Sequence, residues 1–171
     1  MIKVIDNFLS ESEFSFFKEI INNPNFYADN KPFTPNGNSN IGNYYNRKFI
    51  TPSDNIEKRI CECLKLEYES LKFKISNCWI NHIYVDTNKN DNFHKDHSPV
   101  SVVLFLNEGF IGGNLEYKDF NGDINIITPK ENRLIIIDKK CRHRVRNVME
   151  GNRYTFVAFL EFEKKISKTI I

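Results

Sequence analysis

The sequence predicts a mainly β protein with an α+β layout, in which two N-terminal helices flank a jelly roll. Within residues 1–72, two segments repeat their apolar residues at helical spacing, and from Phe73 onward the spacing changes. Short segments rich in β-branched and aromatic residues then alternate with turn residues, as they do in sandwiches and barrels. The predicted strands are residues 75–85, 92–96, 100–106, 113–118, 123–128, 133–138, 143–149 and 153–162.

The N-terminal part begins with an extended segment at residues 2–9, and the first helix follows it. Ser10 and Glu13 form a capping box, with Ser10 as the N-cap and Glu13 at the third helical position. We expect this helix to end just before Pro24, because a proline disfavours helical geometry in the residue that precedes it. The apolar stripe of this helix comprises Phe14, Phe17, Ile20 and Ile21.

An irregular segment and a second helix come next. Residues 22–46 are rich in Asn, Pro and Gly, which favours a long loop. Such loops often serve as lids or binding loops, but a surface excursion without a role explains the segment equally well. Residues 48–50 predict a short strand, and Ser53 or Asp54 then caps a helix that runs to about Ser70. The apolar stripe of the second helix comprises Ile56, Ile60, Leu64, Tyr68 and Leu71.

Length and composition set limits on domain number and partners. We expect residues 1–171 to form a single domain, with residues 1–72 as helical support and Asn-rich loop, and residues 73–163 as the jelly-roll core. The net charge of +2 argues against non-specific binding to nucleic acid. No apolar run reaches the length of a membrane span, and Asp6 interrupts the N-terminus before a signal-peptide core can form, so we expect a cytoplasmic protein. The four cysteines include no C-x-x-C pair and are expected to be reduced thiols.

The predicted chemistry centres on His94, Asp96 and the distant His143. His94 and Asp96 are two residues apart, and in an extended strand such residues project from the same face. His143 would add a second imidazole on one side of a metal and leave other coordination positions open. Two histidines and one carboxylate with open positions are the ligand set expected of a non-haem Fe(II) oxygenase. The alternative for each histidine is an ordinary surface or hydrogen-bonded residue.

Four features of residues 75–162 follow one another in order: an H-x-D motif, an apolar strand, a Gly-Gly pair, and a histidine with an arginine ten residues after it. They are His94 to Asp96, Val102 to Asn107, Gly112-Gly113, and His143 with Arg153. Together they resemble the Fe(II)/2-oxoglutarate-dependent dioxygenases, and among these the prolyl 4-hydroxylase-like branch. The resemblance implies a double-stranded β-helix, the cupin-like form of the jelly roll. It implies Fe(II), 2-oxoglutarate and O2 as cofactor and co-substrates, with ascorbate as a stimulant, and His94, Asp96 and His143 as catalytic metal ligands.

The resemblance also assigns residues to 2-oxoglutarate. Arg153 is implied to bind the distal carboxylate, because a planar guanidinium matches a carboxylate through two hydrogen bonds; the alternative is an internal ion pair. Thr155 is implied to donate a hydroxyl hydrogen bond to the same carboxylate, and Tyr84, ten residues before His94, to support the co-substrate. Phe105 stands where several prolyl hydroxylases carry a tyrosine, so either Thr155 takes over that contact or 2-oxoglutarate binds more weakly.

A basic strip surrounds the late histidine. Arg142, Arg144 and Arg146 alternate with His143 and are expected on the face of the strand away from the metal. We interpret the strip as a solvated face, with contact to an acidic substrate or nucleic acid as the alternative.

The predicted reaction is hydroxylation of an unactivated C–H bond with release of succinate and CO2. By the resemblance, the substrate is a peptidyl residue, most simply proline, so the expected partner is a peptide or protein; a free amino acid or other small molecule is an alternative. Nucleic-acid oxidative demethylases usually carry a second arginine six residues after the co-substrate arginine, and this chain has Phe159 there, so nucleic acid is a disfavoured partner. The non-enzymatic alternative is a jelly-roll binding or sensor module.

Overall fold

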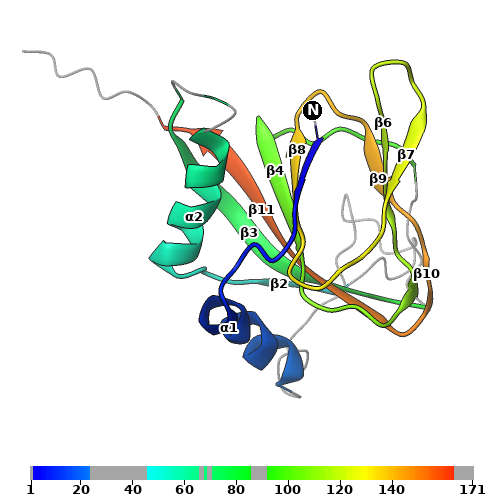
Figure 1. Ribbon diagram of the computed structural model, residues 1–171, viewed down its shortest axis with the longest axis horizontal. Coiled ribbons are helices and arrows are strands. Elements are labelled where there is room, and N and C mark those ends of the chain that lie inside the picture. Colours follow the sequence, from blue (N-terminus) through cyan, green and yellow to red (C-terminus); the bar gives the residue numbers. More distant parts are fainter. Residues whose placement is uncertain (1, 24–45, 66–67, 69–70, 86–91, 164–171) are drawn as a thin grey trace, which may run out of the picture.

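The computed structural model describes residues 2–23, 46–65, 68, 71–85 and 92–163, and consists of antiparallel strands with two helices (Figure 1). The elements are β1 (Ile2–Ile5), α1 (Glu11–Asn22), β2 (Asn46–Phe49), α2 (Asp54–Lys65), β3 (Phe73–Tyr84), β4 (Val100–Phe105), β5 (Ile111–Gly112), β6 (Leu115–Lys118), β7 (Ile124–Ile127), β8 (Leu134–Asp138), β9 (His143–Val145), β10 (Val148–Glu150) and β11 (Asn152–Phe162).

The strands form three sheets. The large sheet has the order β1-β8-β4-β11-β3-β2, a three-stranded sheet has the order β7-β6-β9, and β10 pairs with β5. Figure 1 shows β6, β7 and β9 on one side of the large sheet and both helices on the other. The mainly β class with two N-terminal helices and the double-stranded β-helix are thereby confirmed.

The large sheet is buried on both faces, which explains why its central strands read as continuous apolar runs. On β4, Leu104 packs into a core shared with Phe17 of α1 and Ile60 of α2. The next residue, Phe105, packs into a second core between the sheets, together with Leu115 of β6. Successive residues of β4 therefore pack on opposite faces of the large sheet. The core between the sheets lies next to the cavity described below.

The predicted capping box begins α1. The backbone N–H of Ser10 donates to Glu13 Oε2 at 2.9 Å, and the backbone N–H of Glu13 donates to Ser10 Oγ at 3.4 Å. The helix ends at Asn22, ahead of Pro24 as expected. The second helix ends at Lys65, and the last residues predicted for it fall partly on positions 66–67 and 69–70, outside the described residues. Most of the predicted irregular segment, residues 24–45, also lies outside them.

Two strand predictions need correction. Residues 92–96 form no strand, because only His94 makes a β-bridge there. Residues 143–149 are two strands rather than one: β9 pairs with β6, whereas β10 pairs with β5 in a different sheet. Between them, the N–H of Arg146 donates to the Asn114 carbonyl and the Asn147 carbonyl accepts from the Gly113 N–H, so the chain passes along the segment that links β5 to β6.

Neither of the two helices in the described ranges combines the length and the apolar composition that crossing a bilayer requires. All four cysteines are free thiols.

Candidate functional site

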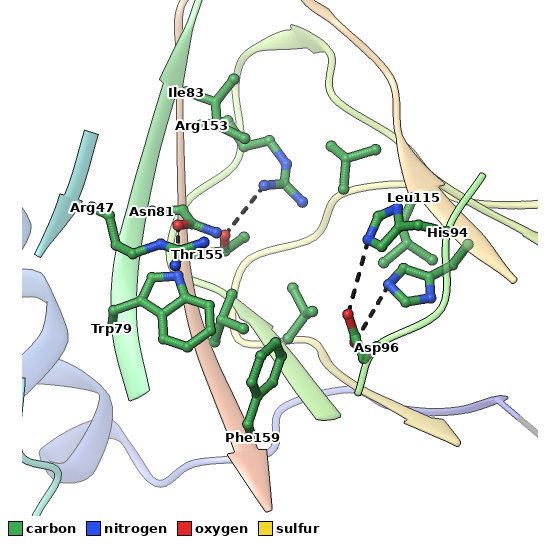
Figure 2. Close-up of a pocket in the computed structure, with 14 residues that line it drawn as sticks. Arg47, Trp79, Asn81, Ile83, His94, Asp96, Leu115, Arg153, Thr155 and Phe159 are labelled. Atoms are coloured by element: carbon green, nitrogen blue, oxygen red, sulfur yellow. Dashed lines mark hydrogen bonds and ion pairs between the residues drawn. The ribbon is translucent and has the colours of Figure 1, made fainter. Parts of the chain in front are cut away.

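The structure brings His94, Asp96 and His143 together (Figure 2). His94 and His143 are joined by an antiparallel bridge, in which each backbone N–H donates to the other carbonyl at 3.0 and 2.9 Å. Asp96 Oδ1 lies 3.9 Å from His94 Nε2, and Asp96 Oδ2 lies 3.5 Å from His143 Nε2. One potential ligand atom from each residue lies within 4.8 Å of the others, a spacing that a single metal ion can bridge.

Backbone carbonyls fix how both imidazoles are oriented. His94 Nδ1 lies 3.3 Å from the Asn92 carbonyl oxygen, and His143 Nδ1 lies 3.2 Å from that of Cys141. Because a carbonyl only accepts hydrogen bonds, Nδ1 carries the proton in each ring. Nε2 of each ring, which lies near Asp96, is then the nitrogen that can bind a metal, as is usual for metal-binding histidines.

Ser101 is a site residue that the sequence analysis missed. Its hydroxyl donates a hydrogen bond to Asp96 Oδ2, and the serine is buried at the start of β4. The contact orients the carboxylate toward the two imidazoles. The available signal was a single polar residue within an otherwise apolar strand, Val100–Phe105.

A cavity of about 140 Å³ opens beside the three residues. The triad has one accessible side, because the His94 side chain is 55% exposed while those of Asp96 and His143 are 13% and 7% exposed. Most of the cavity wall is apolar, and Figure 2 shows the arginines on the side opposite the triad. The apolar lining residues are Trp79, Ile83, Val103, Leu115, Val145, Val157 and Phe159.

Arg153 is a fully buried cation on this wall. Its Nε donates to the Gly113 carbonyl at 3.0 Å, its Nη1 donates to Thr155 Oγ1 at 3.2 Å, and its guanidinium carbon lies 4.9 Å from the centre of the Phe105 ring. Nη2 has no hydrogen-bond partner among the described residues. Burial lowers the pKa of Arg153 to about 9, because desolvation disfavours the charged form. The internal ion pair considered from the sequence does not occur with any described carboxylate, so the guanidinium calls for an external anion.

Thr155 and Phe105 both lie beside Arg153, but Tyr84 does not. Thr155 is buried and pairs with Phe105 across the sheet. On β3, Asn81 and Ile83 line the cavity, and Tyr84 therefore points to the opposite face, where its ring centre is 5.1 Å from that of His82. Tyr84 is not among the residues that line this cavity, and its contact with the co-substrate stays a prediction.

Arginines of the basic strip contact Glu116 of β6, in the three-stranded sheet, and Phe93. Arg144 Nε donates to Glu116 Oε2 at 2.7 Å, and Arg146 Nε lies 3.6 Å from Glu116 Oε1. The Arg144 guanidinium also stacks over the Phe93 ring at 4.3 Å. Arg142 and Arg146 are exposed, as the interpretation of a solvated face expects, whereas Arg144 is half-buried by its contacts with Glu116 and Phe93.

Comparison with known families accounts for this arrangement. Residues 81–161, which include the triad and Arg153, match the model of the 2OG-Fe(II) oxygenase superfamily. These residues belong to the 2OG-Fe(II) oxygenase superfamily. Membership implies Fe(II), 2-oxoglutarate and O2 as the cofactor and co-substrates of this oxygenase region. No curated protein sequence matches the chain significantly.

Solved structures share the fold of this chain at low sequence identity. A prolyl-4-hydroxylase from Pseudomonas putida is 16% identical with a TM-score of 0.71, over 95% of this chain and 93% of that one. A prolyl hydroxylase from Trichoplax adhaerens, in complex with a hypoxia inducible factor peptide, is 15% identical with a TM-score of 0.68, over 94% and 83%. The carbocyclase SnoK from nogalamycin biosynthesis is 8% identical with a TM-score of 0.74, over 95% and 79%. At these identities the likeness establishes the fold alone.

Proposed function

We propose that this chain is an Fe(II)- and 2-oxoglutarate-dependent oxygenase that hydroxylates an unactivated C–H bond of a peptidyl residue, most simply proline. One observation carries the proposal: a two-histidine, one-carboxylate cluster and a fully buried arginine with an unpartnered Nη2 face the same cavity. A metal site alone would not require the buried cation, and a buried cation alone would not require the metal ligands. The dicarboxylate 2-oxoglutarate needs both.

The residues fit this cofactor and co-substrate. His94, Asp96 and His143 would hold Fe(II), and Asp96 would offset part of its charge. Arg153 would bind the distal carboxylate of 2-oxoglutarate through Nη2, and Thr155 would add its hydroxyl. Bound Fe(II), with 2-oxoglutarate and O2, supplies the oxidising power that inserts one oxygen atom into a C–H bond and releases succinate and CO2.

The protein's own part is orientation and the exclusion of water. The Phe105 ring packs against one face of the Arg153 guanidinium. Phe105 has no hydroxyl, and among the described residues it is the Thr155 hydroxyl that contacts this guanidinium. The apolar wall around Val103 and Val157 would exclude water when the co-substrate is bound, which would strengthen the pairing of Arg153 with a carboxylate.

Two structural neighbours that are prolyl hydroxylases, one of them in complex with a peptide, support a peptide substrate. A small-molecule substrate is the second candidate, because SnoK, a carbocyclase from nogalamycin biosynthesis, has the same fold. Phe159 lines the cavity where a second arginine would be expected in a nucleic-acid demethylase, which disfavours that class. The intact triad disfavours a non-catalytic module. We further propose that residues 1–171 form one such domain and that it acts in the cytoplasm.

The test is turnover of 2-oxoglutarate. Purified protein with Fe(II), 2-oxoglutarate and a library of proline-containing peptides should form succinate and a product heavier by one oxygen atom. H94A should lose iron and turnover, whereas H97A, which removes an exposed histidine three residues away, should retain both. Failure of the wild-type protein to bind Fe(II) and to form succinate with any substrate would end the proposal.

A further inference from the structure

The segment that carries His94 has little regular structure to hold it in place. Residues 92–96 form no strand, and His94 meets the three-stranded sheet through its isolated bridge to His143. The His94 side chain is 55% exposed, so the imidazole itself is only partly packed. A metal ligand at such a position gains from an anchor elsewhere in its segment, because ordering a loose segment on binding costs part of the binding energy.

The preceding side chain, Phe93, lies against two cations of the three-stranded sheet. Its ring centre is 4.3 Å from the Arg144 guanidinium carbon and 5.0 Å from Lys118 Nζ. Tyr117 of β6 pairs with His143 of β9. Lys118 and Arg144 each follow one of these paired residues, so they project from the face of the sheet away from the His143 imidazole, here called the outer face. A cation within about 6 Å of an aromatic face is attracted to it, and each of the two strands supplies one.

Both the ring and the peptide group of Phe93 are tied to the strand that carries His143. Arg144 Nε donates to Glu116 Oε2 at 2.7 Å, and Glu116 is buried, which fixes the guanidinium beneath the ring. Arg142 Nη2 donates to the Phe93 carbonyl at 3.4 Å. On the other side of β9, the ring centre of the next residue, His94, lies 4.5 Å from that of His143. Two consecutive side chains therefore lie on opposite sides of β9, one among cations and one in the triad.

We propose that Phe93 is a positioning residue of the metal site. Lys118 and Arg144 hold its ring on the outer face, and the ring fixes the backbone from which the His94 imidazole reaches the metal. The role rests on the proposed function, because it concerns His94 as a ligand of Fe(II). Without the ring, the segment spends a smaller fraction of time in the geometry that binds Fe(II), and the apparent dissociation constant rises in inverse proportion to that fraction.

The affinity for Fe(II), measured by anaerobic equilibrium dialysis without 2-oxoglutarate, tests this role. We expect F93A to weaken Fe(II) binding about 10-fold, as is typical when the support of a metal ligand is removed. F93L keeps apolar bulk but offers no aromatic face to the two cations, so it should weaken binding like F93A. F93Y keeps the ring and should bind Fe(II) within about twofold of the wild type. F120A is a control, because Phe120 is 96% exposed in the turn after β6 and its removal should leave the affinity unchanged.

A second measurement, on the metal-free protein, separates positioning from a general loss of stability. The His94 N–H donates to the His143 carbonyl at 3.0 Å, so its hydrogen exchange reports how often the segment opens. Loss of two cation–ring contacts should speed this exchange about 5- to 30-fold in F93A. I56V is the control matched for stability, because it removes one buried methyl group from the core around α2. It should leave both the Fe(II) affinity and the exchange of His94 at wild-type values.

The role of Phe93 is refuted if F93A keeps the wild-type affinity or exchange rate, if F93L binds Fe(II) as tightly as F93Y, or if I56V changes either quantity as much as F93A. The proposed function fails in a different way. A wild-type protein that binds no Fe(II) would end it, and with it the role of Phe93 at a metal site, whereas a wild type that binds Fe(II) no better than F93A refutes the role of Phe93 alone.

Discussion

Methionine in place of Arg153 (R153M) removes the buried charge and keeps a side chain of similar length. Arg153 is 1% exposed, and burial lowers its pKa from the ordinary value of an arginine to about 9. At about 1.4 kcal/mol per pH unit, burying the charge costs the ligand-free protein at least about 4 kcal/mol. The variant leaves the Gly113 carbonyl and the Thr155 hydroxyl without their donor, which costs about 2 kcal/mol. We therefore expect the free energy of unfolding of ligand-free R153M to exceed that of the wild type by about 2 kcal/mol.

The same substitution should abolish the response to 2-oxoglutarate. A ligand at a hundredfold excess over its Kd raises the free energy of unfolding by about 2.7 kcal/mol, and we expect this rise in the wild type with Fe(II) but not in R153M. Urea denaturation with and without 2-oxoglutarate measures both effects. R133M is the matched control, because Arg133 is paired with Asp6 outside the cavity and its loss should leave the response intact. Ligand-free R153M that is clearly less stable than the wild type, or equal stabilisation of both by 2-oxoglutarate, would show that Arg153 is a structural residue.

Three further predictions concern the surroundings of the metal and of Arg153. S101A removes the hydroxyl that orients Asp96 and should weaken Fe(II) binding about 10- to 100-fold in equilibrium dialysis, without lowering helix and strand content; unchanged affinity would contradict this role. Alanine at Gly113 would place Cβ 2.8 Å from Arg153 Cδ, whereas at Gly109 it meets nothing. Both substitutions should cost about 1–2 kcal/mol, because both residues have positive φ, but only G113A should weaken 2-oxoglutarate binding in calorimetry, and equal weakening in the two would refute the steric argument. Chelation of the metal should remove the stabilisation by 2-oxoglutarate and added Fe(II) should restore it; a response that survives full chelation would exclude a role for the triad in co-substrate binding.

The sequence was informative where a local period or spacing determines structure. The capping box at Ser10 and Glu13 begins α1 as predicted, and the β-branched runs became β4 and β8. The spacing of His94 and Asp96 placed both side chains on one side, even though residues 92–96 form no strand. Such features depend on neighbours along the chain, which a sequence displays directly.

Contacts between distant segments were decided by the tertiary structure. The register between β3 and β11 sets Asn81 and Thr155 in the cavity wall and turns Tyr84 away from it, although Tyr84 was the residue singled out from its distance to His94. The register of β2 against β3 places Arg47 over the Trp79 ring, a contact that no sequence motif indicated. Strand pairing joins residues without regard to their separation in sequence, and a shift by one residue would exchange the two faces of a strand. The sequence by itself therefore determined which chemical groups this protein has for binding a metal and a dicarboxylate, while the sheet register decided which of them share one cavity.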